Sequence, residues 1–449
     1  MKSFSQARSW HRLVASLLCT LCLCAPAAAE SIAIVNVNVI PMTTDAVYDS
    51  QTVVVTDGVI AKIGDVGDVA VPAGATVIDG TDRYLMPGFV EMHGHVTGTG
   101  PRQLERLFSL FLANGVTTVR GMLGRPAHLV VRERIASGDL RGPRLITSGP
   151  SLNGDSVRNA QDGARKVREQ HAAGYDFVKI HPGLSAAEFN AIADQANALG
   201  MPFAGHVPVS VGVLGAIDKG IATIDHLDGY MAALVPANAD STGGYGGFFD
   251  VLLANDVDER RIGMLVAKTI EAGVANVPTQ TLFEQLVSNT PAGDLATRAE
   301  MQYMDNKVVQ EWVGRKQQTV SEKGFSVEVA SRAIAIRRNL IRSLHQAGGV
   351  LLLGSDAPQI FNVPGFSLHR ELELMVAAGL SPWEALRSGT VAPAGFLGIN
   401  AGTVETGKLA DLVLLDANPI EDISNSHRVH GVITGDKWYR ATALLSEAR

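Results

Sequence analysis

Residues 86–96 read MPGFVEMHGHV, a short apolar run that follows a Pro-Gly step and ends in two histidines. A brief apolar run bounded by turn residues is typical of a buried strand. Side chains alternate along a strand, so His93 and His95 point to the same side. Because neutral imidazole is the commonest protein ligand for zinc-like metals, the stretch predicts a strand that ends in a pair of metal ligands.

The same strand-like pattern recurs downstream, each time followed by a helical stretch such as SAAEFNAIADQANALG at 185–200. Alternation of strands and helices implies a parallel sheet. With residues 86–96 the pattern predicts eight strands, and hence an α/β fold with an (α/β)8 TIM-type barrel over residues 86–400 and a polar helical insertion near 284–330. The other strand candidates are GVTTVRGM, RLITSG, DFVKIH, PFAGHV, ATIDHL, VANVPT and VLLLGSDAP.

The two flanks of this region have a different character. Residues 30–85 and 401–449 contain short alternating runs broken by Gly and Asp, and the TDG step at 56–58 between two β-branched runs is typical of a hairpin. We predict that both chain ends together form one small β-sandwich domain.

Residues 1–29 have the pattern of a secretory signal peptide. Three basic residues precede an apolar run at 13–25, and Ala27, Ala28 and Ala29 follow. The run is too short to span a bilayer and ends in the small residues that a signal peptidase requires. We expect cleavage near Ala29 and export of a periplasmic or secreted protein.

All three cysteines, Cys19, Cys22 and Cys24, lie in this leader, so the mature protein would have no disulfide and no thiolate metal ligand. Cys22 and Cys24 raise the alternative of a lipid anchor. Leu precedes each of them where lipoprotein processing favours a small residue, which favours soluble export.

Charge and composition exclude several function classes. The chain has 449 residues, 46% hydrophobic, which is too apolar for disorder, and a formal charge of −7. Loss of Lys2, Arg8 and Arg12 with the leader leaves 35 of the 38 basic residues against 45 acidic ones, a charge of −10. Nucleic-acid and anionic-membrane binding are disfavoured, and no later apolar run is long enough for a membrane span.

Further metal-ligand types stand at the ends of other predicted strands: Lys179, His206, His226 and Asp356. Barrel enzymes build their active sites at this face. Asp356 can touch a metal and accept a proton from water. Lys179 could ligate a metal once CO2 has carbamylated it; alternatively it pairs as a cation with Asp176 or a substrate carboxylate. A single histidine near a strand end is usually structural, but this set together favours a metal site.

These motifs resemble the amidohydrolase superfamily of binuclear metal-dependent hydrolases. The residues that carry the resemblance are PGFVEMHGH, FVKIHPGLSAAEF, AGHVP, DHLDGY, GSDAP and GTVETGKLADLVLLDANP, spread over nearly the whole mature chain. They are most similar to the branch of metal-dependent prolidases, Xaa-Arg or Xaa-Lys carboxypeptidases and ochratoxin-type amidases.

The resemblance implies two divalent ions. His93, His95 and Asp356 would hold the first, His206 and His226 the second, and carbamylated Lys179 would bridge them. Zinc is the default, although manganese, cobalt or iron suit the same ligands. A hydroxide between the metals would attack the carbonyl, with Asp356 as general acid and base.

Three residues are candidates for substrate contact: Arg120, Tyr230 and His181. Arg120 and Tyr230 stand where they could bind a substrate carboxylate, or equally hold loops together. His181 shares a strand face with Lys179 and could contact substrate or support the loop. In the glycine-rich segment near 240–250, Tyr245, Phe248 and Phe249 could form an apolar wall over the site, or pack beneath an insertion.

The sequence therefore predicts an enzyme that hydrolyses a C–N amide bond of a small molecule, with a dipeptide or N-acyl amino acid bearing a free carboxylate as the preferred substrate. A lactonase or cyclic-amide hydrolase is the alternative, because the same attack opens lactones and lactams. From another class, the chain could be an inactive binding protein on the same barrel, although the intact ligand set opposes this. Lys179 argues against a deaminase. A homo-oligomer is compatible with the resemblance.

Overall fold

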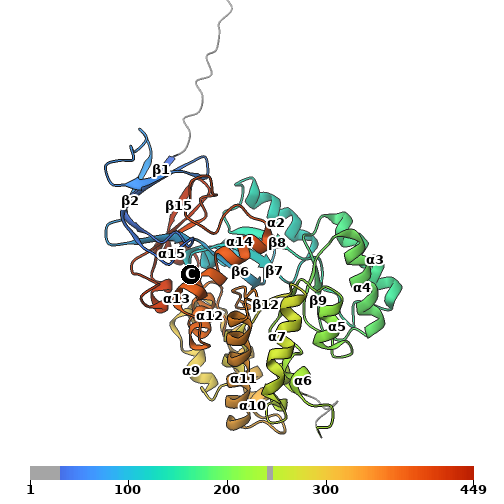
Figure 1. Cartoon of the computed structure of the whole chain (residues 1–449). Coiled ribbons are helices and arrows are strands. Elements are labelled where there is room, and N and C mark those ends of the chain that lie inside the picture. The colour runs from blue at the N-terminus through green and yellow to red at the C-terminus, as the bar shows by residue number, and fades with distance from the viewer. Residues whose placement is uncertain (1–30, 240–245) are drawn as a thin grey trace, which may run out of the picture.

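The computed structural model describes residues 31–239 and 246–449 (Figure 1). The expected leader at 1–29 with its three cysteines lies outside these residues, and so does Tyr245.

One end of the molecule is a mixed sheet of eight strands built from both ends of the chain (Figure 1). The order is β15-β14-β13-β5-β1-β2-β3, with β4 paired to β1. The strands are β1 (Ser31–Val39), β2 (Tyr48–Thr56), β3 (Val59–Asp65), β4 (Thr76–Asp79), β5 (Tyr84–Pro87), β13 (Leu412–Leu415), β14 (Val429–Thr434) and β15 (Lys437–Arg440).

The two chain ends pair with each other and share one apolar core, so they build one β unit. β5 pairs with β1 in parallel and with β13 in antiparallel, so the eight strands belong to one hydrogen-bonded sheet and not to two separate ones. Ile34, Val53 and Leu414 lie in its apolar core. The predicted hairpin at 56–58 is confirmed: Asp57 and Gly58 both have the positive φ that its turn requires.

The central part of the chain forms parallel sheets, as the strand and helix alternation predicts. One sheet has the order β6-β7-β8 and the other β12-β11-β10-β9. All of these neighbours pair in parallel. The strands are β6 (Phe89–Gly94), β7 (Val116–Gly121), β8 (Arg144–Thr147), β9 (Val178–Ile180), β10 (Phe203–Gly205), β11 (Thr223–Asp225) and β12 (Ala275–Val277).

The eighth predicted segment, residues 350–358, is not a regular strand. It meets its neighbours through isolated parallel bridges, Asn276 with Leu351 and Gly94 with Ala357, and a third bridge joins Ser148 to Phe177 between the two sheets. Backbone groups of this segment bond outside the sheet ladder, Leu353 N–H to the Ser388 carbonyl and Ser355 N–H to the Glu91 carboxylate, which interrupts the regular pairing. Regular sheet pairing thus covers seven of the eight predicted segments.

Helices follow these strands and pack around them (Figure 1). They include α1 (Pro101–Ala113), α2 (Pro126–Ala136), α3 (Ala160–Ala173), α4 (Ala186–Leu199), α5 (Gly212–Asp218), α6 (Tyr230–Leu234), α7 (Ile262–Glu271), α11 (Val327–Gln346), α12 (Phe366–Ala377), α13 (Pro382–Ser388) and α14 (Val391–Leu397). The ends of α4 show why the predicted helix forms: Ser185 and Glu188 make a capping box, and Gly200 ends the helix in the left-handed conformation.

The expected helical insertion is present between β12 and α11. It consists of α8 (Gln280–Val287), α9 (Ala292–Ala296), the 3-10 helix η3 (Ala299–Tyr303) and α10 (Asn306–Val320). Its own apolar cluster includes Met301, Tyr303 and Trp312, together with Phe361 from the loop after Asp356. The insertion is therefore packed directly against a loop that carries a candidate ligand.

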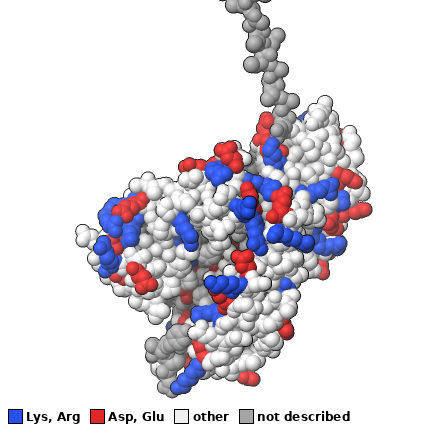
Figure 2. All heavy atoms as spheres, turned by 180° about the vertical axis from the view of Figure 1, so that it is seen from behind, with Lys and Arg blue, Asp and Glu red and all other residues white. Residues whose placement is uncertain are grey.

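The remaining helical elements are the 3-10 helices η1 (Phe248–Leu253), η2 (Glu259–Arg261) and η4 (Ile423–His427), and α15 (Ala441–Glu447). Among the described residues, no helix is both long and apolar enough to cross a bilayer. Figure 2 shows acidic and basic side chains interspersed on the face it draws, without one large basic patch.

Candidate metal centre

The six predicted metal ligands lie at the same ends of the parallel strands. His93 is the penultimate residue of β6 and His95 directly follows that strand. Lys179 is in β9, and His206 and His226 directly follow β10 and β11. Asp356 lies between Leu351, which bridges to β12, and Ala357, which bridges to β6. The carboxyl ends of parallel strands meet at one face, so residues far apart in sequence converge here.

His93, His95 and Asp356 form the tightest part of this group. The Oδ1 atom of Asp356 lies 2.5 Å from His95 Nε2 and 3.6 Å from His93 Nε2. One candidate ligand atom from each of the three residues lies within 4.8 Å of the other two. The structure thus brings together the three residues expected to hold the first ion.

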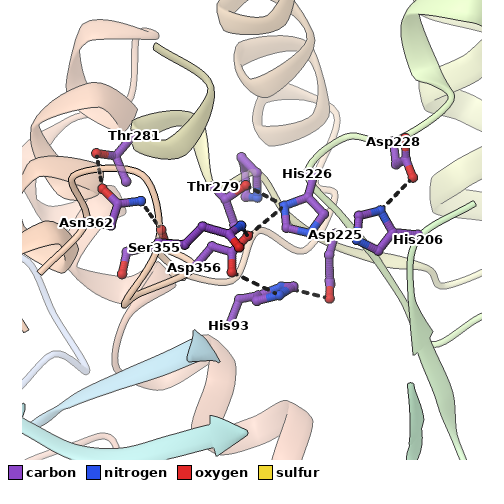
Figure 3. A network of polar contacts seen from close by, with 12 residues as sticks. His93, His206, Asp225, His226, Asp228, Thr279, Thr281, Ser355, Asp356 and Asn362 are labelled. Carbon is purple, nitrogen blue, oxygen red and sulfur yellow. Dashed lines mark hydrogen bonds and ion pairs between the residues drawn. The ribbon is translucent and has the colours of Figure 1, made fainter. Parts of the chain in front are cut away.

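The imidazoles form a continuous row. Ring centroids are 5.4 Å apart for His95 and His93, 4.5 Å for His93 and His226, and 4.6 Å for His226 and His206. Figure 3 shows the rings of His93, His226 and His206 side by side, with Asp356 at one flank and Asp228 at the other. The two histidines expected to hold the second ion therefore adjoin the first group.

Lys179 reaches into this cluster from β9 and is fully buried. Its Nζ lies 3.6 Å from Asp225 Oδ2 and has no hydrogen-bond partner among the described residues. Gly205 makes room for it, since a Cβ there would lie 2.8 Å from Lys179 Cδ. Burial lowers the pKa of the ammonium, which favours the neutral amine that carbamylation requires.

The alternative pairing of Lys179 with Asp176 is wrong. Asp176 instead accepts hydrogen bonds from Arg132 and from the backbone N–H of Thr147.

Three side chains that the sequence analysis missed hold the imidazoles in place. Asp228 Oδ2 lies 3.0 Å from His206 Nδ1, and Thr279 Oγ1 lies 2.8 Å from His226 Nδ1. Asp225 Oδ2 lies 3.0 Å from His93 Nδ1. Such contacts on one ring nitrogen orient the ring and direct the other nitrogen toward a metal.

The chemical state of the cluster fits divalent metals. Burial, joined by neighbouring positive groups, lowers the pKa of His93 and of His226 well below the ordinary range, so both rings are neutral as metal ligation requires. His95 Nδ1 and Lys179 Nζ are buried and without hydrogen-bond partners among the described residues. Buried polar atoms without partners are costly, and a nitrogen and oxygen donor set without thiolate suits zinc-like ions.

The backbone is strained at this site. Asp356, His226 and Thr279 have φ values of 62°, 64° and 45°, in the left-handed region that residues other than glycine seldom adopt. Each such residue costs on the order of 1–3 kcal/mol, which surrounding contacts must offset. Arg337 of α11 supplies some of them, since it donates hydrogen bonds to the carbonyls of His226 and Pro278.

Arg120 does not have the predicted role in substrate contact. Its side chain is buried, Nε donates to the Met92 carbonyl at 2.7 Å, and Nη2 lies 3.2 Å from Asp225 Oδ1. Strand alternation directs the residue into the interior beneath the metal ligands, where it fixes Asp225. This is the structural alternative that the sequence left open.

Tyr230 is likewise inside the fold. It is fully buried, its hydroxyl lies 2.9 Å from Thr269 Oγ1, and burial raises its pKa to about 12. The left-handed Gly229 begins α6 just before it and turns the ring toward α7. A substrate carboxylate contact at Tyr230 is therefore also corrected to a packing role.

His181 and Phe249 lie at the edge of the cluster. The His181 ring is 5.0 Å from that of His206, and burial together with Lys179 lowers its pKa to about 2, so it is neutral. Phe249 stacks on His226 at 4.8 Å and on His206 at 6.1 Å, with Phe248 beside it. Of the two interpretations of these phenylalanines, the structure favours an apolar wall over the site.

Glu91 links β6 to the segment 350–358, and these two segments lead to His95 and Asp356. The sequence analysis missed this residue. Its Oε1 accepts the backbone N–H groups of His93 at 2.9 Å and Ser355 at 2.8 Å, while Oε2 accepts the Ser355 hydroxyl. Burial raises its pKa to about 8. An acidic residue inside the apolar run FVEMHG was the available signal.

Comparison with known proteins agrees with this geometry. Residues 84–439 match the model of the amidohydrolase family. Among curated proteins, a dihydroorotase of Mycobacterium tuberculosis is 47% identical over 53 residues, which are 12% of each chain. The similarity thus spans only about an eighth of that protein's length.

Several solved structures share the fold over nearly the whole chain. A putative prolidase from Bifidobacterium longum has a TM-score of 0.68 at 24% identity, covering 93% of this chain and 99% of its own. A Xaa-Pro dipeptidase gives 0.64 at 22%, covering 92% and 100%. Bottromycin amidohydrolase gives 0.70 at 22%, covering 93% and 88%.

Glu91→Ala is expected to weaken metal binding by roughly 10- to 100-fold, because the backbone next to two ligands loses its shared acceptor. Glu91→Gln, whose amide oxygen can still accept both N–H groups, should restore most of it. Metal affinity is measured by competition with a chelator, and Glu105→Ala on the exposed face of α1 is the control. Equal affinity in the Ala and Gln variants would contradict this positioning role.

Proposed function

The chain belongs to the amidohydrolase family, and from this premise we propose that it is a metal-dependent hydrolase that cleaves a C–N bond in small amides or peptides. The observation that carries the proposal is the convergence of His93, His95 and Asp356 within 4.8 Å, next to a row of neutral imidazoles and a buried lysine. Such a set suits catalysis better than simple packing.

We assign the first divalent ion to His93, His95 and Asp356 and the second to His206 and His226, with Lys179 as a bridging carbamate. Zinc is the expected metal. When bound, the ions would polarise the scissile carbonyl and lower the pKa of the attacking water. The partnerless Lys179 Nζ and the neutral histidines support this assignment.

Asp356 would move the proton. A water oxygen forms the new bond to the carbonyl carbon while its proton passes to the Asp356 carboxylate. The same proton then goes to the leaving nitrogen as the C–N bond breaks, which yields a carboxylic acid and an amine. Gln359 Nε2 lies 3.1 Å from Asp356 Oδ2 and would keep the carboxylate in position.

The preferred substrate is a dipeptide or N-acyl amino acid with a free carboxylate. The names of fold neighbours support an amino-acid product, since they include prolidases and a Xaa-Pro dipeptidase. His181 at the cluster edge remains a candidate substrate contact, whereas Arg120 and Tyr230 are committed to internal contacts.

We further propose that residues 86–400 act as one closed barrel, flanked by a β domain made of residues 30–85 and 401–449. The parallel bridges at the seams between the sheets support closure. Export to the periplasm or medium, after cleavage near Ala29, follows from the leader pattern at 1–29.

The first test combines metal analysis with a substrate library. The purified mature chain is expected to hold about two divalent ions per molecule and to release free amino acids from a mixture of dipeptides and N-acyl amino acids. Removal of metal by a chelator should abolish turnover, and zinc should restore it. Cleavage of lactones or cyclic amides in place of these substrates would identify the protein as a lactonase or cyclic-amide hydrolase. Absence of bound metal after reconstitution would refute the metal-dependent mechanism.

Asp356→Asn is expected to retain much of the metal but lose roughly 10²- to 10⁴-fold in kcat, because an amide cannot accept the proton of the attacking water. Metal content and steady-state rates on one library substrate are compared with those of Asp194→Asn, a surface replacement of the same kind. Near-normal turnover would remove Asp356 from proton transfer.

Lys179→Ala is expected to lose metal and activity together, because the bridging carbamate cannot form. Short carboxylic acids such as acetate should restore part of both by occupying the vacated space. The exposed Lys268→Ala serves as the control for loss of a lysine. Unchanged metal content in Lys179→Ala would show that this residue is not a bridge.

A further inference from the structure

A cavity lies between the helical insertion and the loops that follow His95 and Asp356. Its volume is about 330 Å³, at the lower end of the roughly 300–1,000 Å³ typical of small-molecule sites. It has room for one part of a small substrate. The lining residues that matter here are Thr97, Arg106, Leu107, Leu110, Met304, Val308 and Pro358.

The cavity adjoins two of the candidate ligands. Thr97 is two residues after His95, and Pro358 is two residues after Asp356. Two residues of extended chain span roughly 7 Å, so the cavity wall begins about that far from the tight ligand group. A substrate whose carbonyl lies at the metals can therefore extend a side chain or terminus into it.

The wall is mainly apolar and contains one basic and one acidic side chain. Leu107 and Leu110 come from α1, and Met304 and Val308 come from the insertion. Among the described residues that line the cavity, Arg106 is the only basic one. Asp305 also lines the cavity, so its charged groups are Arg106 and the carboxylate that Arg106 contacts. A mainly apolar hollow with a few polar groups is the usual form of a small-molecule site.

The guanidinium of Arg106 has N–H donors that protein groups do not fully use. Its Nη2 donates to the Tyr303 carbonyl at 2.8 Å, which fixes the side chain over the cavity. Its Nε is buried and has no hydrogen-bond partner within residues 31–239 and 246–449. The side chain as a whole is 36% exposed, so a ligand would reach the outer edge of the guanidinium, and a carboxylate is the group that this fork matches.

The contact between Arg106 and Asp305 does not exclude this. Nη1 lies 3.4 Å from Asp305 Oδ1, a long contact to a carboxylate whose side chain is 77% exposed. Exposed pairs of this kind contribute little to stability, so a ligand carboxylate could replace Asp305 at small cost.

We propose that this cavity, the Arg106 pocket, binds the amino-acid half of the substrate, with the apolar side chain against Leu107, Leu110 and Val308 and the free carboxylate on Arg106. This rests on the proposed function and assigns the substrate class: amides whose leaving amine is an apolar amino acid. It also supplies the cation that Arg120, committed to Asp225, does not provide.

The test uses two probes that cannot be hydrolysed, L-leucine and L-leucinol, which differ in the carboxylate. Calorimetric titration of the metal-loaded protein is expected to show tighter binding of L-leucine. Arg106→Gln should lower the affinity for L-leucine at least tenfold and leave the affinity for L-leucinol nearly unchanged, because only L-leucine has the carboxylate that hydrogen-bonds to the charged guanidinium. Arg102→Gln, the same replacement at an exposed position of α1, should change neither.

Val308→Trp provides a second variant that leaves Arg106 in place and narrows the cavity. This variant should lower the affinity for L-leucine and for L-leucinol to the same extent. Equal affinity of the unaltered protein for the two probes, or an Arg106→Gln variant that keeps the preference for L-leucine, would overturn the proposal. These results do not depend on turnover, so a protein that binds L-leucine as expected but hydrolyses no library amide would refute the proposed function and leave the pocket assignment standing.

Discussion

The carboxylate of Asp225 is fully buried and faces a guanidinium, an imidazole and a lysine amine. Arg120 Nη2 lies 3.2 Å from Oδ1, while His93 Nδ1 and Lys179 Nζ lie 3.0 and 3.6 Å from Oδ2. A buried charge is tolerated only when it is paired, so this group ties β6, β7, β9 and β11 together beneath the metal ligands. The positions of His93 and Lys179, and with them the spacing of the whole cluster, depend on it.

Much of this site could be predicted from the sequence. Histidines, a lysine and an aspartate recur at the ends of successive apolar runs, and parallel strands bring those ends to one face. The prediction fails for Arg120 and Tyr230. A substrate contact requires a side chain at the mouth of the site, and both of these side chains are buried below it. Both follow strand-like runs, but alternation and the turn at Gly229 direct them inward, and a sequence pattern does not show how far a side chain lies below the mouth.

The residues that sequence analysis missed act through contacts between distant segments. Glu91 accepts the N–H of Ser355, 264 residues away in the chain, and Thr279 meets His226 across 53 residues. Pairs of this separation leave no local pattern. The pairing of the two chain ends in one mixed sheet has the same origin, because it depends on β5 pairing with both β1 and β13.

The two flanks of the metal centre differ, and the difference constrains the substrate. Phe249 covers His226 and His206 on one side with an aromatic face that offers no hydrogen-bond partner. On the other side, next to His95 and Asp356, the wall combines leucines with the guanidinium of Arg106. An amide held between them would have its charged terminus directed toward Arg106 and its other half against the phenylalanine. Since charge cannot be buried against an aromatic face without a partner, the proposed Arg106 pocket would orient the scissile bond before chemistry begins.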